Sequence, residues 1–181
     1  MIDIESPAQI LITGIMAAGK STIAQRVAEK LPKSVHLRGD VFRRMIVTGR
    51  VEMQPPPSKE ALKQLRLRYQ LAAQAADGYC AAGFSVVYQD VIIGAILQEA
   101  VAMHRTWPLY VVVLCPSPAV AIERDAHRHK QVYQSWTPDE LDHALRHDTP
   151  KLGFWLDSSS LGVEATVGTI FAHLDVARIM F

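Results

Sequence analysis

Apolar and polar residues follow two different periods along the chain. Short, mostly apolar runs at residues 9–13, 84–90 and 109–114 are typical of strands buried in a parallel sheet. Between such runs, apolar residues recur every third or fourth position, which predicts amphipathic helices. Strand and helix signals alternate along the chain, and this alternation predicts an α/β domain whose parallel sheet has helices on both faces. The predicted strands are 9–13, 34–37, 84–90, 109–114 and 154–158, and the predicted helices are 21–30, 41–48, 59–82, 95–104, 119–128, 138–147 and 163–179.

Capping and breaking residues mark the ends of several predicted helices. The three prolines at 55–57 interrupt regular structure, and Ser58 is placed to cap the long helix that Gly83 ends. Thr137-Pro138-Asp139-Glu140 is a capping box with proline at the first helical position. The segment 127–136 before it is rich in cations and has no helical or strand period. We interpret that segment as a mobile flap.

Residues 14–21, Gly-Ile-Met-Ala-Ala-Gly-Lys-Ser, match the phosphate-binding pattern G-x-x-x-x-G-K-[ST]. The match lies where a strand should pass into a helix, which is the context that this motif requires. Gly14 and Gly19 permit backbone dihedrals that are closed to other residues, so successive N–H groups can turn toward a phosphate. Lys20 is expected to reach the β- and γ-phosphates, and the Ser21 hydroxyl to bind Mg²⁺. We predict a site for ATP and Mg²⁺ contacted by Gly14, Ala17, Ala18, Gly19, Lys20, Ser21 and Thr22; the alternative is a glycine-rich turn with a surface lysine.

Two carboxylates lie at the ends of predicted strands, where ligands bind in parallel sheets. Asp90 closes the third strand and is predicted to bind Mg²⁺ or the accepting substrate, the alternative being a turn former. Asp40 follows the second strand, with Gly39 expected to let the chain turn sharply. A carboxylate there is suited to accept the proton of an attacking hydroxyl or to orient that hydroxyl. Capping of the next helix is a second role for Asp40, compatible with the first.

Four arginines are candidates for binding charged substrate groups. Arg43 and Arg44 follow Asp40 on the next helical turn and are predicted to bind an anionic group of an acceptor. Arg124 and Arg128 lie one helical turn apart and lead into the flap. An arginine delivered on closure stabilises the charge that phosphoryl transfer spreads over the γ-oxygens, so both are candidate catalytic residues. The alternative for this pair is a solvated, charged helix face.

With these motifs the chain resembles the adenylate-kinase-like P-loop kinases. The resemblance rests on the phosphate loop, the Gly39-Asp40-x-x-Arg43 element, the strand ending at Asp90 and the arginine-bearing flap, and it covers the chain from Ile10 to the last helix. Within this group, the chain is similar in particular to small ATP-dependent phosphotransferases such as chloramphenicol phosphotransferase and zeta-toxin-like kinases.

The resemblance implies a fold and a set of roles. The fold is a three-layer P-loop NTPase fold with a five-stranded sheet in the order 2-3-1-4-5, a short lid at about 127–136 and an acceptor-binding region at about 40–75. Asp40 takes the place of an acceptor-binding or acceptor-activating carboxylate, and Asp90 that of a Walker-B-like residue. The resemblance also implies that Arg43 binds the acceptor and that Arg124 and Arg128 lie at the base of the lid.

Composition bounds these expectations. With 181 residues and 49% hydrophobic content, the chain suits a single domain over 1–181. The net charge of +1 offers no case for nucleic-acid binding. An acidic amino terminus and the lack of a long apolar stretch favour a cytoplasmic protein without a membrane segment. A monomer or a homodimer is expected. Cys80 and Cys115 are expected to pack in the interior, and His127, His129, His143 and His147 are expected to be surface residues and not metal ligands.

We therefore predict a kinase that transfers the γ-phosphate of Mg-ATP to a hydroxyl or phosphate of a small-molecule acceptor. The alternative is a nucleotide-dependent regulatory ATPase or switch that acts on a macromolecular partner. The absence of an Asn-Lys-x-Asp motif argues against a GTPase, and the short chain without a tandem acidic Walker B motif argues against an AAA+ machine. Antibiotic, sugar, nucleoside and sugar-nucleotide acceptors all stay open.

Overall fold

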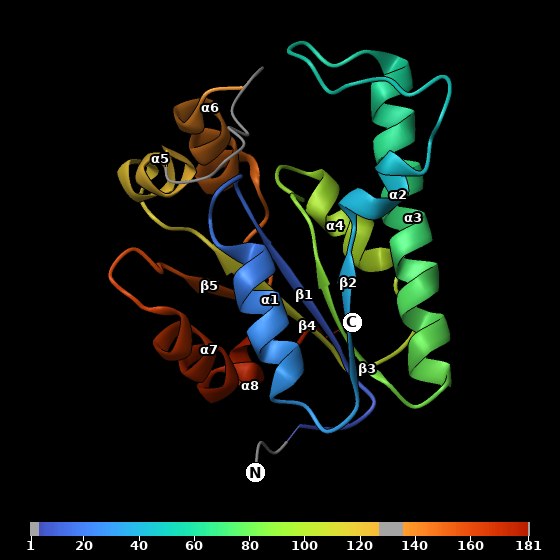
Figure 1. The fold of residues 1–181 in the computed structure, drawn as a ribbon, viewed down its shortest axis with the longest axis vertical. Coiled ribbons are helices and arrows are strands. Elements are labelled where there is room, and N and C mark those ends of the chain that lie inside the picture. Colours follow the sequence, from blue (N-terminus) through green and yellow to red (C-terminus); the bar gives the residue numbers. More distant parts are fainter. Residues whose placement is uncertain (1–3, 127–135, 181) are drawn as a thin grey trace.

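A five-stranded parallel sheet forms the centre of the protein, which a computed structural model describes for residues 4–126 and 136–180 (Figure 1). The strand order is β2-β3-β1-β4-β5, and every neighbouring pair is parallel. This confirms the predicted order. The strands are β1 (Gln9–Gly14), β2 (Ser34–Arg38), β3 (Ser85–Gln89), β4 (Leu109–Leu114) and β5 (Phe154–Leu156).

Burial follows the position of each strand in the sheet. All residues of β1, β3 and β4 are buried, as their apolar sequences require, whereas the edge strand β2 is half-buried. Gln89 at the end of β3 pairs with Ile12 of β1 and with Arg38 of β2. The carboxyl ends of these three strands therefore lie together, and the loops that leave them share one edge of the sheet.

Helices cover both faces of the sheet, as predicted. In Figure 1, α1 and α7 lie in front of the sheet and α4 lies behind it. Ion pairs to Glu164 from Arg26 of α1 and from Lys30, directly after α1, join the two front helices. The helices are α1 (Lys20–Glu29), α2 (Asp40–Arg44), α3 (Lys59–Ala81), α4 (Ile96–Ala102), α5 (Pro118–Ala126), α6 (Pro138–His143), α7 (Val163–Ala172) and α8 (Leu174–Ala177).

The helix signals of α3 and α6 operate as predicted. Ser58 caps α3 by accepting a hydrogen bond from the Ala61 backbone N–H at 3.1 Å. Gly83, at φ 80°, ends the same helix in the left-handed region. The capping box at Thr137 and Glu140 is complete at the start of α6. On α3 the buried positions are mostly alanine, so this long helix packs closely against the sheet.

Helix α2 and the predicted last helix are shorter than expected. Helix α2 ends at Arg44, four residues before the predicted end at Thr48. Three β-branched residues follow, and Val47 among them is 92% exposed, so no burial supports another helical turn. The predicted last helix breaks at His173, because the chain turns back to β4. There Arg178 pairs with Tyr110 in an antiparallel bridge.

The helix that begins after Thr137 changes its winding instead of continuing to His147. After α6, residues Ala144–Asp148 form a π-helical turn. Thr149 follows this turn, and its hydroxyl donates to the Ala144 carbonyl at 2.9 Å and accepts from the Gly94 N–H at 2.6 Å. The turn is thereby bonded to the loop between β3 and α4. The last strand is also shorter than predicted and ends at Leu156.

Candidate active site

The phosphate loop has the backbone that its glycines predict. Gly14 and Gly19 have φ angles of 144° and 90°, and Ala17 also lies in the left-handed region at φ 59°. A side chain at Gly14 would in addition collide with the Leu114 carbonyl of β4. Helix α1 begins at Lys20, directly after the loop. The loop therefore presents its amides together with the positive end of a ten-residue helix, an arrangement that favours phosphate.

Lys20 and Ser21 take different positions at the start of α1. The Lys20 side chain is buried, and its Nζ donates to the Ile15 carbonyl of the loop at 2.6 Å. Ser21 is exposed on the first turn. The lysine charge is thus held within the loop, and the hydroxyl is open to a ligand. In nucleotide sites Mg²⁺ takes one or two protein oxygens together with phosphate oxygens and water, so an open serine hydroxyl at the end of a phosphate loop fits a magnesium nucleotide.

Thr13, which the sequence reasoning missed, joins the loop strand to the segment after β3. Its hydroxyl donates to the Ile92 carbonyl at 2.8 Å and accepts from the Ile92 N–H at 2.9 Å. Both groups are buried, so the two bonds hold the chain after Asp90 against the base of the phosphate loop.

Asp90 lies directly after β3 and is almost fully buried, with three partners. Its carboxylate accepts hydrogen bonds from the Tyr88 hydroxyl at 3.1 Å and from the Val91 N–H at 2.7 Å. The third partner is Arg68 of α3, whose Nε donates at 2.7 Å and whose guanidinium forms an ion pair with the carboxylate. These contacts hold Asp90 in one orientation at the carboxyl end of the sheet.

Sequence reasoning did not identify Arg68. The feature of the sequence that could have identified it is a cation among the buried positions of a helix. Arg68 lies on α3 among Ala61, Tyr69 and Ala72, which are all buried. Next to it, the Tyr69 hydroxyl donates to the Val91 carbonyl at 2.7 Å. Burial raises the pKa of Tyr69 to about 12, so the phenol stays a donor at neutral pH. Helix α3 therefore supports the carboxylate segment through two consecutive side chains.

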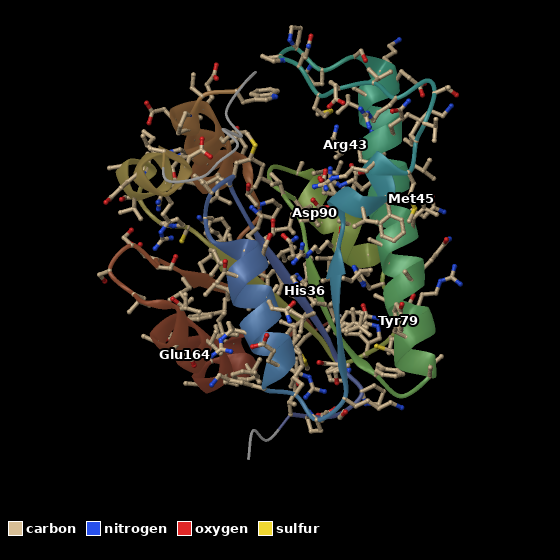
Figure 2. The ribbon with its side chains drawn as sticks, in the orientation of Figure 1. His36, Arg43, Met45, Tyr79, Asp90 and Glu164 are labelled. Atoms are coloured by element: carbon tan, nitrogen blue, oxygen red, sulfur yellow. The ribbon has the colours of Figure 1, made fainter. Side chains whose placement is uncertain are left out.

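Position 39 requires glycine because there is no room for a side chain, and not, as predicted, because the chain turns sharply there. Its φ of −61° and ψ of −34° are open to any residue. A Cβ at this position would overlap the carboxylate of Asp90, at 2.5 Å from its Cγ. The close approach brings the β2–α2 connection against Asp90, and Figure 2 shows Asp90 and Arg43 at the same end of the sheet.

Asp40 is the first residue of α2 and binds both arginines predicted near it. Its carboxylate accepts from Arg43 Nε at 3.1 Å and from Arg44 Nε at 2.5 Å. Arg43 also donates to Glu52 at 2.6 Å. Burial opposes ionisation of Asp40, but the hydrogen bonds from the two arginines outweigh it and lower the pKa of the carboxyl. Asp40 makes no capping bond to any residue that the structure describes, so the helix-cap interpretation finds no support.

Arg124 lies beside the phosphate loop. A Cβ added to Gly19 would be 3.9 Å from Arg124 Nη1, and Nη2 donates to the Ser158 carbonyl after β5 at 2.9 Å. The guanidinium therefore stands between the loop and the β5–α7 connection. Arg128 and most of the predicted flap lie outside the described residues, since positions 127–135 are not among them.

Arg146 of the π-helical turn is a further residue that sequence reasoning missed. Its Nη2 donates to the carbonyls of Cys115 and Pro116, at 3.1 and 3.2 Å, and its Nε donates to Asp142 at 2.9 Å. The arginine thus satisfies carbonyls just beyond the carboxyl end of β4. Its signal in the sequence is weak, because an ordinary helix would have placed the side chain differently.

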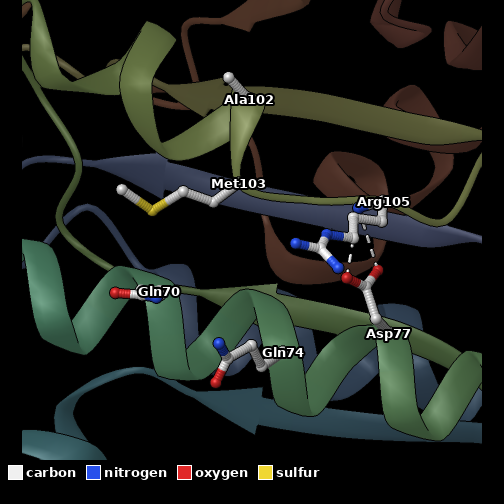
Figure 3. A pocket seen from close by; sticks show the side chains of 6 residues that line it. All are labelled: Gln70, Gln74, Asp77, Ala102, Met103 and Arg105. Atoms are coloured by element: carbon white, nitrogen blue, oxygen red, sulfur yellow. Dashed lines mark hydrogen bonds between the residues drawn. The ribbon is translucent and has the colours of Figure 1, made fainter.

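Cavities occur at both ends of the fold. A groove of about 300 Å³ lies beside the phosphate loop, and its lining is Ser21, Thr22, Gln25, Arg26 and Arg38. A cavity of about 450 Å³ lies between α3 and the end of α4 (Figure 3). Asp77, which lines that second cavity, accepts a hydrogen bond from Gln9 at the start of β1. The second cavity is therefore at the amino end of β1, away from the loop at its other end.

Other candidate chemistry is absent from the part of the chain described here. Cys80 and Cys115 are buried free thiols, as predicted. His143 and His147 are exposed, and within residues 4–126 and 136–180 no group of three His, Cys, Asp or Glu side chains could hold a metal ion. None of the described helices is long and apolar enough to cross a membrane.

Solved structures of kinases share this fold. A sugar kinase from Janibacter sp. HTCC2649 has a TM-score of 0.72 and 19% identity, over 94% of this chain and 95% of that chain. Adenylylsulfate (APS) kinase CysC of Mycobacterium tuberculosis, in complex with AMPPNP and APS, has a TM-score of 0.69 and 16% identity, over 94% and 98%. A gluconokinase from Sinorhizobium meliloti 1021 has a TM-score of 0.63 and 17% identity, over 93% and 92%. At these identities the likeness establishes the fold alone.

Sequence comparison adds the family. No curated protein matches the chain by sequence. A family model described as an AAA domain, AAA_33, matches residues 10–147. That range runs from β1 through the phosphate loop, the two strand-end carboxylates and α6. Because the model spans most of the chain, the protein belongs to the AAA_33 family of P-loop domains.

Proposed function

We propose that the protein transfers the γ-phosphoryl group of Mg-ATP to a hydroxyl or phosphate of a small-molecule acceptor. One observation carries the proposal: the phosphate loop, Asp40 and Asp90 lie at the same edge of one parallel sheet, with Arg124 beside the loop. Phosphoryl transfer to an acceptor requires a phosphate-binding loop for the donor and, beside it, polar groups that position the acceptor. The loop and the two carboxylates at this edge provide both. The kinase fold shared over more than nine-tenths of the chain supports it.

The donor half consists of the loop and the start of α1. Loop amides and the helix terminus bind the phosphates, and the Lys20 ammonium leaves its bond to the Ile15 carbonyl to reach the β- and γ-phosphates. Ser21, with Asp90 at the carboxyl end of β3 as the second oxygen donor, would hold Mg²⁺, which would neutralise the developing phosphate charge. Arg124 is placed to stabilise the same charge, and Arg128 is proposed to act with it.

The acceptor half is the region around Asp40 and Asp90. In the transfer, the bond between the γ-phosphorus and the leaving oxygen of ADP breaks, and a bond to the acceptor oxygen forms. A hydroxyl acceptor releases its proton to water, directly or through Asp40, whereas an ionised phosphate acceptor has no proton to release. The two arginines lower the pKa of Asp40, which weakens it as a base. We therefore assign Asp40 chiefly to orienting the acceptor hydroxyl, with Arg43 and Arg44 able to bind an anionic acceptor group.

The second candidate function is a nucleotide-dependent switch acting on a macromolecular partner, which the description of the family as an AAA domain favours. The two functions differ in what stimulates ATP turnover. A kinase releases ADP in step with phosphorylation of a small acceptor. A switch releases ADP only when its partner is present.

The test is a panel of sugars, sugar acids, nucleosides, nucleotides and antibiotics, assayed for ADP release with Mg-ATP. The proposal expects acceptor-dependent turnover that Lys20→Ala abolishes together with ATP affinity measured by calorimetry. The control Lys33→Ala, at an exposed position directly before β2 and so at the opposite end of the sheet, should change neither. Asp40→Asn should keep ATP binding and lose at least about 100-fold in transfer. Asp175→Asn, on the exposed side of α8, is its control. Unchanged ATP affinity in Lys20→Ala would refute the donor site.

A further inference from the structure

Glu52 lies in the connection between α2 and α3, at the end of the molecule where β1, β2 and β3 end (Figure 1). Gln64 of α3 fixes the backbone just before it. The Gln64 side chain accepts a hydrogen bond from the Val51 N–H at 2.9 Å and donates to the Gly49 carbonyl at 2.9 Å. Two hydrogen bonds from one helix therefore hold this part of the connection, and with it Glu52, in a defined place.

The Glu52 carboxylate occupies the guanidinium of Arg43. Arg43 Nη1 donates to both oxygens of Glu52, at 2.8 and 2.6 Å, and its Nε donates to Asp40 at 3.1 Å. Arg50 adds an ion pair to Glu52 at 3.1 Å. Arg43 is one of the arginines assigned above to an anionic group of the acceptor, and such a group would need the same N–H donors. An anionic acceptor therefore reaches Nη1 of Arg43 only by displacing Glu52.

Charge in this ion cluster is nearly balanced. Among the described residues, the cluster contains the carboxylates of Asp40 and Glu52 and the guanidinium groups of Arg43, Arg44 and Arg50. One positive charge is in excess, and without the Glu52 carboxylate two would be. Arg44 is bonded to Asp40 and its side chain is 71% exposed, so water weakens its attraction for an anion. Glu52 is thus the residue that decides how strongly the cluster attracts an anionic group.

We propose that Glu52 determines the charge of the acceptor. By holding Arg43 it disfavours anionic acceptors, and it leaves the site to uncharged molecules whose hydroxyl Asp40 orients. Sugars, nucleosides and neutral antibiotics belong to this class, whereas sugar acids and nucleotides do not. Arg43 keeps the capacity to bind an anion, but only after Glu52 has left it. The inference rests on the kinase function proposed above and narrows its acceptor.

The test compares acceptors that differ in charge, such as glucitol with gluconate, or a nucleoside with its 5′-phosphate. The readout is the ratio of kcat/KM for the anionic acceptor to kcat/KM for the neutral one, which we expect to be below one in the wild type. Glu52→Gln should raise this ratio by about 10-fold, the lower end of the range for a hydrogen bond to a charged group, because the Glu52 side chain is 54% exposed. Glu52→Asp, which keeps the charge, should restore part of the wild-type ratio.

Arg43→Gln tests whether Glu52 acts through Arg43. In the Arg43→Gln background, adding Glu52→Gln should change the ratio by less than about twofold, because no guanidinium is released at position 43. The matched control is Glu5→Gln, which removes a carboxylate that is 60% exposed and paired with Arg178, and which should leave the ratio unchanged. Thermal unfolding of each variant separates a change in specificity from a loss of folded protein. A full rise of the ratio without Arg43 overturns the proposed role of Glu52.

The outcomes separate this inference from the general proposal. If no acceptor of either charge stimulates ADP release from the wild type, the kinase function fails, and the inference fails with it. If acceptors turn over but Glu52→Gln leaves the ratio unchanged, the inference alone is wrong. The same holds if the wild type prefers the anionic member of each pair, because Glu52 then does not keep Arg43 from an anion.

Discussion

Replacing Asp90 by asparagine removes the charge that balances Arg68 while keeping nearly the same side-chain shape. In the native protein the carboxylate is bonded to Arg68, to the Tyr88 hydroxyl and to the Val91 N–H. After the replacement, the guanidinium of Arg68 stays between α3 and β3 without a counter-charge. We therefore predict that Asp90→Asn destabilises the fold, in addition to any effect on catalysis.

The burial of the pair sets the size of the effect. The Asp90 side chain is 2% exposed and the Arg68 side chain 12%. Removing one partner of a buried ion pair costs about 3–5 kcal/mol in the free energy of unfolding. The residual access of water to Arg68 places the expected loss at the lower end, about 3 kcal/mol. For a domain of this size, such a loss lowers Tm by roughly 6–12 °C.

Urea denaturation at pH 7 measures this loss. The control is Glu99→Gln, which breaks the exposed pair between Arg66 and Glu99 and should change the unfolding free energy by less than about 1 kcal/mol. Adding Arg68→Met to Asp90→Asn removes the unbalanced charge and should recover about 2 kcal/mol as coupling energy. If Asp90→Asn costs no more than Glu99→Gln, Arg68 and Asp90 are not a buried structural pair and the reasoning is wrong.

Two further predictions concern stability. Gly39→Ala should lose about 1–3 kcal/mol, because its Cβ displaces the Asp90 carboxylate, whereas Gly78→Ala inside α3, with open space around it, should gain about 0.5–1 kcal/mol; both are read from urea denaturation. Burial lowers the pKa of His104 to about 4, so between about pH 6.5 and pH 4 the unfolded chain binds a proton that the native state does not. Stability should fall by up to about 3 kcal/mol as the pH drops through this range, and His104→Gln should flatten that dependence; a dependence unchanged by this variant would contradict the assignment.

Local sequence was sufficient for the strands, the phosphate loop and most helix ends. The all-apolar run of β4 is typical of a buried parallel strand, and the dihedrals of Gly14 and Gly19 follow from their place in the motif. Such features depend on residues within about one helical turn of each other. Local signals were less reliable where burial decided the outcome, as at the end of α2, where exposed Val47 leaves the helix without support.

The sequence by itself determined that a nucleotide loop stands at the end of a buried strand, because that loop's shape is set by its own glycines and by the strand and helix beside it. Only the tertiary structure decided which distant side chains meet there: Arg68 from α3 on Asp90, and Arg124 beside Gly19. It also brought Arg38 of β2 to the groove beside Ser21. An arginine looks the same in the sequence whether it is solvated, paired or free. Its partners depend on the packing of elements that are far apart in the chain, and no local pattern records that packing.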